Sequence, residues 1–383
     1  MSSVITKSTL RFLAPVAGPV DLLIIAGEHS GDEHAARMLS GALAQRPGLR
    51  VAALGGPRLR AAGAQLLHDM TTTSVIGFVE TLKHLSFFRA LFDEVLRWIG
   101  EYQPRVVCFV DSSGLNLRIA QQMAERGLSV KAGGKIKTVY YISPQIWASR
   151  AGRRFKMAKY LDALAVIFPF EPEVYADTKL PVEFVGHPFM AEHVVSPVRF
   201  DPDGPVLLLP GSRRSAVGRI FPVMLAAYEK FAERDAVAIY PSEDILKVLR
   251  AANPPSRIEL RPAGEPVAAS AVLTSSGTMS MRCALAGIPG VVMYRAHPLE
   301  YVLGRLLVKV PYLGIANLLL KEPMYPEYIQ GAAKADVLAQ ELKNCLSDPN
   351  RRAETAVRAE KLRAILSQPA KGSAADWLVR QLG

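Results

Sequence analysis

The chain has 383 residues, enough for two or three domains that each bury a core, which excludes a peptide or a single small domain. Half of its residues are apolar and 21% are charged, so the composition excludes an intrinsically disordered chain. The formal net charge of +11 favours anionic partners, namely nucleic acid, acidic lipid headgroups or phosphorylated metabolites, without choosing among them.

The first segment, residues 1–18, is predicted to be a loose leader, because Pro15 interrupts its apolar run and no convincing cleavage site follows. No stretch of about 18 consecutive apolar residues occurs, so no membrane-spanning helix is predicted. The cysteines, Cys108, Cys283 and Cys345, are odd in number and widely spaced. They argue against a disulfide framework or a zinc site and fit a reducing compartment.

Short apolar runs then alternate with amphipathic segments, which predicts parallel sheets covered by helices on both faces. Helical spacing is clear at 33–44 and 116–126. The predicted strands are, in chain order, 21–26, 51–54, 106–110, 138–142, 163–167 and 182–185, and then 206–209, 236–240, 271–274 and 290–293.

The stretch 195–205, with three prolines and two aspartates, separates the two groups of strands. We therefore expect an α/β protein with two Rossmann-like, doubly wound domains, residues 19–197 and 198–350, that face a cleft. Residues 351–383 are expected to form helices that pack back across this cleft. In such folds the ligands bind at the carboxyl ends of the strands.

The first strand-end loop, residues 27–32 (Gly-Glu-His-Ser-Gly-Asp), combines glycines for a tight turn with a helix start that exposes unpaired N–H groups. Gly27, Glu28, Ser30 and Gly31 are therefore candidate ligand contacts. The alternative is a plain helix cap, since Ser and Asp are common at that position.

Asp111 follows the strongly apolar strand 106–110, so its carboxylate is expected at the carboxyl edge of the sheet with an apolar wall behind it. Such a carboxylate suits a general base, a role that typically gives about 10² to 10⁴ in rate. The alternative is an aspartate that caps the next helix.

The loop 209–215 opens the second domain, and a similar small-residue turn follows the strand 271–274. In the first loop Gly211 and Ser212 let a phosphate approach the backbone, and Arg213 offers bidentate hydrogen bonds to a diphosphate. It is not a Walker A loop, and a solvated arginine pair is the alternative. The second turn holds Ser276, Gly277 and Thr278. Together the two turns favour a nucleotide-diphosphate donor.

Two further strand ends carry unusual side chains. The Ser143–Pro144 bond interrupts any helix and can aim Gln145 and Trp147 into the crevice. His187 stands at the next strand end, where a structural, buried histidine is the alternative.

These motifs resemble those of the lipid-A-disaccharide synthase family, which are inverting glycosyltransferases of the two-domain GT-B type. The resemblance covers nearly the whole chain and rests on residues 26–32, 55–58, 76–80, 143–148, 168–171, 185–188, 209–213 and 276–278. It implies a bacterial enzyme bound peripherally at the inner face of the cytoplasmic membrane. The implied reaction joins UDP-2,3-diacylglucosamine to 2,3-diacylglucosamine 1-phosphate, forms a β-1,6 disaccharide and releases UDP.

The resemblance also implies residue roles. Asp111 matches the family's essential aspartate, Arg213 the arginine of its Pro-Gly-Ser-Arg loop, and Asn317 an asparagine in a later Asn-Leu-Leu segment. In the implied mechanism Asp111 accepts the proton of the acceptor's 6-hydroxyl while Arg213 and the helix ends stabilise the leaving diphosphate.

Four positions depart from the family's pattern. Arg282 stands where a ribose-binding Glu is usual, Ala216 replaces an acidic residue, Gly114 replaces a second aspartate, and Ser149 replaces an aromatic residue. An arginine cannot accept the two ribose hydroxyl protons that a carboxylate can. The departures therefore leave two alternatives, a divergent paralogue with another nucleotide-sugar or acyl-sugar and a catalytically silent nucleotide or lipid binder. A sugar-nucleotide epimerase, which is also built from two such domains, is a further alternative.

The remaining features concern membranes, metals and nucleic acid. Residues 82–102 interleave apolar and basic side chains, which suits an interfacial helix, whereas a core helix with a basic edge is the alternative; the run 299–313 has the same two interpretations. Asp201 and Asp203 resemble an Asp-x-Asp metal site but lie in the proline-rich linker, so neither a metal nor a cofactor is predicted. No nucleic-acid-binding motif occurs, so nucleic acid is not an expected partner. The sequence favours no particular oligomeric state.

Overall fold

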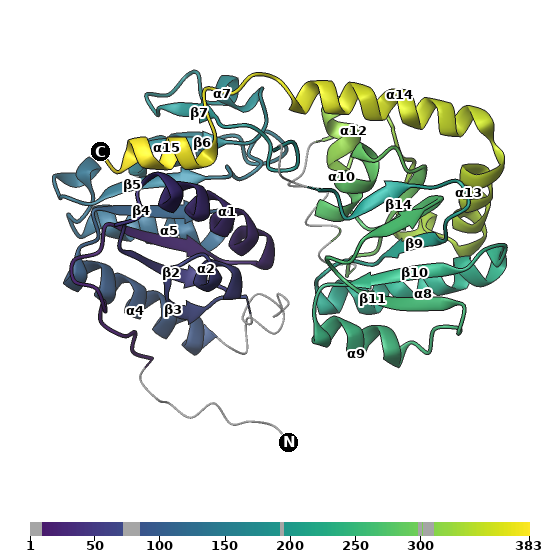
Figure 1. Ribbon diagram of the computed structural model, residues 1–383, viewed down its shortest axis with the longest axis horizontal. Coiled ribbons are helices and arrows are strands. Elements are labelled where there is room, and N and C mark those ends of the chain that lie inside the picture. Colours follow the sequence, from purple (N-terminus) through teal and green to yellow (C-terminus); the bar gives the residue numbers. More distant parts are fainter. Residues whose placement is uncertain (1–9, 72–84, 192–194, 298–300, 302–309) are drawn as a thin grey trace. The chain divides into compact units, whose positions relative to one another are not determined.

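The computed structural model describes residues 10–71, 85–191, 195–297, 301 and 310–383 (Figure 1). The chain divides into two compact units, the first made of residues 1–188 and 369–383 and the second of residues 189–368. The chain therefore passes into the second unit after residue 188, nine residues before the predicted boundary at 197. Of the predicted carboxyl-terminal helical segment, only residues 369–383 belong to the first unit. The predicted common cleft stays a prediction.

The first unit is built on a seven-stranded, all-parallel sheet with the order β3-β2-β1-β4-β5-β6-β7. Its strands are β1 (Leu22–Ala26), β2 (Val51–Gly55), β3 (Gln65–Asp69), β4 (Val106–Val110), β5 (Lys137–Tyr141), β6 (Ala163–Val166) and β7 (Val182–Phe184). β1 and β4 are buried along their whole length, as expected for central strands covered on both faces.

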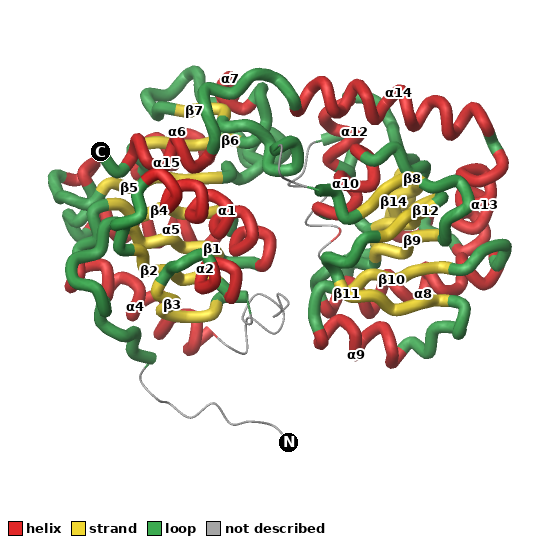
Figure 2. The backbone as a smooth tube through the Cα atoms, viewed as in Figure 1, coloured by secondary structure: helices red, strands yellow, loops and turns green. Residues whose placement is uncertain are grey.

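Helices cover both faces of this sheet (Figure 2). They are α1 (His29–Gln45), α2 (Pro57–Ala61), α4 (Leu85–Tyr102), α5 (Ser113–Glu125), α6 (Arg153–Tyr160), α7 (Glu171–Val174) and α15 (Ala374–Gln381), with a short 3₁₀ turn, η1 (Val130–Ala132). Because successive strand residues point to opposite faces, Leu23 and Ile25 pack with α4, α5 and α6, whereas Leu22 and Ile24 pack with α1 and α15.

The prediction of a loose leader is wrong for residues 10–18, which are the described part of that segment. Phe12 is 5% exposed and belongs to the core under α4. Its backbone N–H donates to the Glu94 carboxylate at 2.6 Å, and the Trp98 indole N–H donates to the Leu13 carbonyl at 3.0 Å. One buried aromatic ring and these hydrogen bonds fix a segment whose own composition has no helical or strand periodicity.

The structure also decides between the two interpretations of residues 82–102 for α4. Leu91, Val95, Leu96, Trp98 and Ile99 are buried in the core of the first unit. The apolar face of α4 is therefore a core face, and the interfacial-helix interpretation is wrong for it. Residues 82–84 and 76–80, and most of the run 299–313, lie outside the described residues. No helix in the described ranges is long and apolar enough to cross a membrane.

The second unit has a six-stranded parallel sheet with the order β11-β10-β9-β13-β14-β15 and a separate parallel pair, β8 with β12. The strands are β8 (Val198–Phe200), β9 (Val206–Leu209), β10 (Ala236–Tyr240), β11 (Ile258–Pro262), β12 (Val267–Ala269), β13 (Ala271–Thr274), β14 (Gly290–Tyr294) and β15 (Glu327–Ile329). β8 lies inside the stretch 195–205, which was predicted to separate the two groups of strands.

The helices of the second unit are α8 (Arg214–Phe231), α9 (Glu243–Ala251), α10 (Thr278–Leu285), α12 (Ile315–Leu320), α13 (Ala335–Ser347) and α14 (Pro349–Leu366), with a short 3₁₀ turn, η2 (Gln330–Ala332). α8, α9 and α13 enclose the core on one side of the sheet, and α14 packs on α10 and α12. All three cysteines are free and buried.

Both large sheets reverse their strand order at one place. In the first unit the chain moves outward from β1 through β2 to β3 and then returns to β4 beside β1. In the second it moves from β9 through β10 to β11 and then returns to β13 beside β9. Ligands of doubly wound proteins bind at this reversal, outside the carboxyl ends of the strands. The loops after β1, β4, β9 and β13 hold most of the predicted site residues.

Candidate active site

The loops after β1 and β4 touch each other at the reversal point of the first sheet. A Cβ on Gly27 would lie 2.5 Å from the Ser112 hydroxyl oxygen, so only glycine fits there. A Cβ on Gly31 would lie 3.8 Å from the Asp111 Cβ. The structure therefore brings Gly27 and Gly31 beside Asp111. Glu28 is the half-buried N-cap residue of α1, and Ser30 lies in the first turn of that helix.

Asp111 has a strained backbone that buried side chains hold in place. Asp111 and Ser112 both have positive φ angles, 50° and 42°, a conformation that costs a non-glycine residue of order 1–3 kcal/mol. The Asn116 side-chain amide donates to the Asp111 carbonyl at 2.9 Å, and the Tyr140 hydroxyl donates to the same oxygen. Ser112, not Asp111, occupies the N-cap position of α5.

The Tyr140 hydroxyl is suited to remain a donor at this place. Burial, and after it the negative charge of Asp111, raise the pKa of Tyr140 well above its usual value of 10. The phenol therefore stays protonated and keeps its hydrogen bond to the Asp111 carbonyl across the physiological pH range. The outcome is a half-buried carboxylate on a turn whose backbone is held by buried side chains.

Asp32, at the end of the first motif, ties this loop to the one after β2. Its buried carboxylate accepts the backbone N–H groups of Gly56, Arg58 and Leu59 at 2.8, 3.0 and 3.1 Å. A Cβ on Gly56 would lie 2.6 Å from that carboxylate, which accounts for a glycine at this position of the motif 55–58. The plain-cap interpretation is therefore wrong for Asp32, because its side chain fixes a neighbouring loop.

Trp147 and His187 meet in an aromatic cluster at the carboxyl ends of β5, β6 and β7. The Trp147 ring lies edge-on to Phe168 and Phe170, with centroids 6.0 and 5.2 Å apart. His187 lies 5.4 Å from the Phe168 ring and is 6% exposed. Trp147 is half-buried, whereas Gln145 is exposed. The cluster joins three of the motifs that carry the family resemblance.

Glu171 is the buried charge-bearing group beneath this cluster. Its carboxylate accepts the backbone N–H groups of Phe168 and Ile167 at 3.0 and 3.2 Å. Burial raises the pKa of Glu171 to about 7, although these two hydrogen bonds and the Trp147 side chain oppose the rise. Its protonation state therefore changes near neutral pH.

In the second unit, the loops after β9 and β13 touch in the same way. Gly211 has φ +110°, which only glycine adopts easily, and a Cβ there would lie 3.1 Å from the Ser275 hydroxyl oxygen. Ser212 and Arg213 are exposed, and Arg213 is the N-cap residue of α8.

The turn after β13 is held by hydrogen bonds of its own side chains and backbone, and by the Ser275 N–H, which donates to the Leu209 carbonyl at the end of β9 at 2.8 Å. Gly277 and Thr278 are exposed and Ser276 is half-buried. The Ser280 hydroxyl donates to the Gly277 carbonyl at 2.6 Å, which closes the first turn of α10.

Arg282, one of the departures from the family's pattern, is 9% exposed on α10. Its guanidinium lies over the Phe189 ring, 4.1 Å from the ring centroid. This cation–π contact packs the chain, where it enters the second unit, against α10. Arg282 is therefore integrated into the fold rather than a simple charge reversal on an open surface.

Asn317 is 1% exposed, and both ends of its amide are engaged. Its amide nitrogen donates to the Tyr325 carbonyl at 2.7 Å and to the Glu327 carboxylate at 2.8 Å. Its oxygen accepts the N–H groups of Met324 and Tyr325 at 2.8 and 3.0 Å. The structure places Asn317 inside the packing between α12 and β15, so a direct ligand contact by Asn317 stays a prediction.

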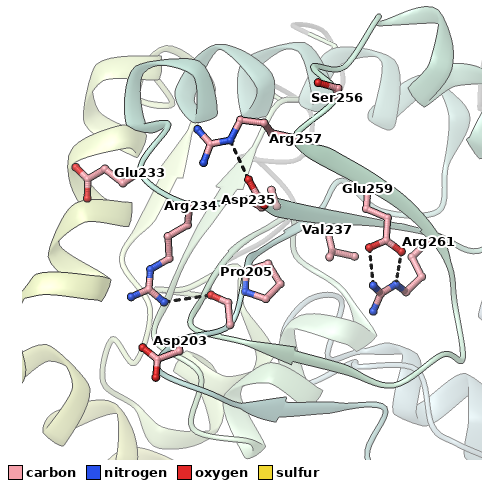
Figure 3. Close-up of a pocket in the computed structure, with 12 residues that line it drawn as sticks. Asp203, Pro205, Glu233, Arg234, Asp235, Val237, Ser256, Arg257, Glu259 and Arg261 are labelled. Atoms are coloured by element: carbon pink, nitrogen blue, oxygen red, sulfur yellow. Dashed lines mark hydrogen bonds and ion pairs between the residues drawn. The ribbon is translucent and has the colours of Figure 1, made fainter.

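A pocket of about 720 Å³ opens near the amino-terminal ends of β9, β10 and β11 (Figure 3). The Gly211 loop follows the carboxyl end of β9, so it lies at the opposite edge of the sheet. Four of the pocket's charged groups form two ion pairs, Arg257 with Asp235 at 2.8 Å and Arg261 with Glu259 at 2.6 Å. Asp203 lines it, and Asp201 accepts the Asp203 N–H at 3.1 Å in a turn before β9. No group of three or more metal-ligating side chains occurs in the described ranges. That the protein uses no metal stays a prediction.

The sequence analysis missed the side chains that hold the site together. Tyr140, Asn116, Asp32 and Glu171 all lie in or beside recognised motifs. The partners of Tyr140 and Asp32 are remote in sequence, whereas Asn116 and Glu171 bond residues at most six positions away. The usable signal was a polar residue inside an otherwise apolar pattern, as at Asn116, which is fully buried on α5. Such a residue needs a buried hydrogen-bond partner.

Among solved structures, this fold is similar to that of UDP-GlcNAc 2-epimerase from Neisseria meningitidis bound to UDP-GlcNAc. The TM-score is 0.59 at 11% identity, over 94% of this chain and 99% of that one. It is also similar to CalG4, the calicheamicin glycosyltransferase, with a TM-score of 0.57 at 15% identity over 95% of this chain and 98% of that one. The predicted α/β fold with two Rossmann-like domains of the GT-B type is confirmed. Because an epimerase and a glycosyltransferase share it, the fold does not choose between their activities.

The family described as lipid-A-disaccharide synthetase matches residues 22–380. The chain is 35% identical over 347 residues to the lipid-A-disaccharide synthase of Nitrosococcus oceani, which covers 86% of this chain and 88% of that protein. It is 34% identical to that of Geobacter sulfurreducens, over 90% of this chain and 91% of that protein. It is 33% identical to lipid-A-disaccharide synthase 1 of Legionella pneumophila, over 94% of this chain and 97% of that protein. The chain belongs to the lipid-A-disaccharide synthase family.

Proposed function

We propose that this protein transfers 2,3-diacylglucosamine from its UDP derivative to 2,3-diacylglucosamine 1-phosphate, forming a β-1,6 disaccharide and releasing UDP. Family membership over residues 22–380 supports the reaction. The observation that carries it to this chain is Asp111. Asp111, which matches the aspartate expected to be essential in the family, lies at the reversal point of the first sheet, on a turn that Asn116 and Tyr140 hold in a strained conformation.

In the proposed step, Asp111 accepts the proton of the acceptor's 6-hydroxyl as that oxygen attacks the anomeric carbon of the donor. The new carbon–oxygen bond forms on the face opposite UDP, and the bond from the anomeric carbon to the diphosphate oxygen breaks, which inverts the configuration. Arg213 and the start of α8 stabilise the charge that develops on the leaving diphosphate. The released proton resides on Asp111 until solvent takes it.

The test is product formation by the purified protein. Wild-type protein mixed with both substrates should give the disaccharide and one UDP for each disaccharide, and no altered donor when the acceptor is omitted. Asp111→Asn keeps the shape and the left-handed turn but cannot accept the proton, so turnover should fall by about 10² to 10⁴ while UDP binding is retained. Turnover within tenfold of wild type would remove Asp111 as the base.

A catalytically silent binder is the second candidate, and Arg282 is the observation that favours it. The guanidinium packed on Phe189 stands where the family usually has the carboxylate expected to bind the ribose. If the protein binds UDP but releases none from the two substrates, and Arg282→Glu does not start turnover, the silent binder replaces the enzyme.

We propose that the protein acts at the cytoplasmic surface of a membrane, as the family resemblance implies; the acyl chains of the proposed substrates, which partition into lipid, support a membrane location. Since the apolar face of α4 is buried in the core, we propose that contact with lipid does not use that face. Sedimentation with phospholipid vesicles tests the association.

A further inference from the structure

Arg153 lies beside the loop that carries the proposed base, and no role has yet been given to it. It is the first residue of α6, and its guanidinium Nη1 donates to the Ser113 hydroxyl at 3.1 Å. Ser113 is two residues from Asp111, a separation that a chain spans with at most about 7 Å. Arg153 is half-buried, so solvent still reaches part of its guanidinium.

The charge of Arg153 is not balanced by the protein in the way that its neighbour's is. Arg154, the next residue, forms a bidentate ion pair with Asp177, with contacts of 2.6 to 3.0 Å. For Arg153, by contrast, no carboxylate lies within ion-pair distance anywhere in the described ranges. The segment 150–160 contains Arg150, Lys156 and Lys159 besides these two arginines, and no acidic residue.

The surroundings of Arg153 oppose its charge. Burial, and after it the neighbouring charge of Arg150, lower the pKa of Arg153, while Tyr140 acts in the opposite direction. An arginine nevertheless stays protonated in proteins. A half-buried cation near a second cation, with one neutral hydroxyl as its protein partner, is best stabilised by an anion from outside the chain.

From this geometry we infer that Arg153 binds the 1-phosphate of the sugar acceptor whose 6-hydroxyl Asp111 deprotonates. The inference rests on the proposed function and deepens it. In one hexopyranose, the two carbons bonded to the ring oxygen carry the 1-phosphate and the CH₂OH group with the 6-hydroxyl. The base and the phosphate-binding group must therefore lie within the span of a single sugar ring, and the short path from Asp111 through Ser113 to Arg153 provides that spacing. A planar guanidinium also matches the phosphate group by two parallel hydrogen bonds.

The test removes the residue and the phosphate in turn. Donor transfer is measured in neutral detergent with 2,3-diacylglucosamine 1-phosphate and with the same sugar lacking the phosphate, for wild type, Arg153→Gln and Arg154→Gln. Arg153→Gln should lower kcat/KM for the phosphorylated acceptor about 10- to 100-fold. It should leave the unphosphorylated acceptor and the KM of the donor within about threefold. Arg154→Gln, whose partner is Asp177, should treat both acceptors alike.

Equal losses with both acceptors would assign Arg153 to the support of the Ser113 loop and overturn the inference. A rise confined to the donor's KM would do so too, since the bound phosphate would then belong to the donor. The cation could instead bind anionic phospholipid headgroups. This alternative is tested with vesicles of phosphatidylcholine and phosphatidylglycerol. If Arg153→Gln no longer binds these vesicles but keeps the wild-type preference between the two acceptors, the cation binds phospholipid, and the inference is likewise overturned.

A failure of the proposed function is distinguishable from a failure of this inference. If the wild type forms no disaccharide, binding of glucosamine 1-phosphate is measured directly by calorimetry. Binding at least tenfold weaker in Arg153→Gln than in wild type and in Arg154→Gln supports the phosphate site on its own. Equal binding by the three proteins, or none, overturns it.

Discussion

The two units share a topology but differ in how their reversal-point loops are held. In the first unit Gly27 and Gly31 are buried and Asp111 is half-buried, and the carboxylate of Asp32 fixes the adjoining loop. In the second unit Arg213 is exposed at the start of α8, and the turn after β13 is closed by its own backbone and Ser280. One half is a network of buried polar contacts and the other presents exposed donors.

This difference matches what each half is proposed to do. A base accelerates proton transfer only if it is within hydrogen-bond reach of the hydroxyl, and errors of about 1 Å are costly, so the Asp111 turn benefits from rigidity. A diphosphate offers several oxygens to a charged side chain, so its binding tolerates more variation in geometry. Substitution of the buried side chains that hold the loops of the first unit should therefore change stability, and substitution of the exposed donors of the second unit should change donor binding and turnover.

Apart from Asp111, the largest effect should come from Arg213. Arg213→Gln removes a charged donor from the proposed leaving diphosphate, so kcat/KM for the donor should fall about 10² to 10³-fold. Because the side chain is exposed, the urea midpoint of unfolding should not change. Arg214→Gln, at the neighbouring and equally exposed residue, is the matched control and should lose little. If both variants lose activity equally, the loop acts through net charge and not through Arg213.

Asp32 should show the opposite behaviour. Asp32→Asn replaces one carboxylate oxygen by an NH₂ group, which then faces the backbone N–H groups of Gly56, Arg58 and Leu59. The lost and weakened hydrogen bonds should lower the free energy of unfolding by about 2–4 kcal/mol. Urea denaturation measures this loss. In protein that remains folded, the KM of the donor should stay near the wild-type value. A stable variant with a raised donor KM would place Asp32 in the binding site and break the comparison between the units.

Glu171 allows a test of the first unit by pH. Burial raises the pKa of its carboxyl from 4.5 to about 7 in the folded protein, so the unfolded chain loses this proton first as the pH rises. Stability should therefore fall between about pH 4.5 and 7, by about 3 kcal/mol in total, and stay constant above that range as far as Glu171 is concerned.

Glu171→Gln carries no titrating proton, and the other groups titrate alike in both proteins. The variant should therefore gain stability relative to wild type as the pH rises. The free energy of unfolding of Glu171→Gln minus that of wild type should be about 2–3 kcal/mol larger at pH 8 than at pH 5. Urea denaturation at the two pH values measures the difference. A difference that does not depend on pH would mean that Glu171 is ionised throughout.

The sequence predicted those parts of the molecule that depend on local pattern. All ten strands expected from apolar runs are present, with bounds that agree to within one residue. The edge strands β3, β11 and β15 were missed, because edge positions do not require a continuous apolar run; every residue of β3, for example, is only half-buried. Phe12 was missed for a related reason, since a single buried ring in an aperiodic segment leaves no pattern.

In the candidate site, too, the features that follow from local pattern were predicted and those that depend on packing were not. Strand ends indicated the loops that hold Gly27, Asp111 and Gly211, because parallel topology sends those ends to one edge. The side chains that fix these loops could not be predicted. Tyr140 reaches Asp111 across 29 residues, and Asp32 reaches Leu59 across 27. Only the packed fold decides which polar groups share a buried hydrogen bond.

The smallest effects are expected from the glycines Gly27 and Gly211, which are required for different reasons. Gly27→Ala should destabilise by about 1–3 kcal/mol, because its Cβ would lie 2.5 Å from the Ser112 hydroxyl oxygen and 2.8 Å from the Ser112 Cβ. Ser112→Gly removes both atoms and suits the residue's positive φ, so the double variant should recover most of the loss. Gly211→Ala should cost about 1–2 kcal/mol through its own backbone at φ +110°, and Ser275→Gly should not rescue it. Urea denaturation of the six variants measures both couplings. Rescue in the first unit and none in the second would mean that side-chain contact restricts the loop beside Asp111, whereas backbone conformation restricts the loop beside Arg213.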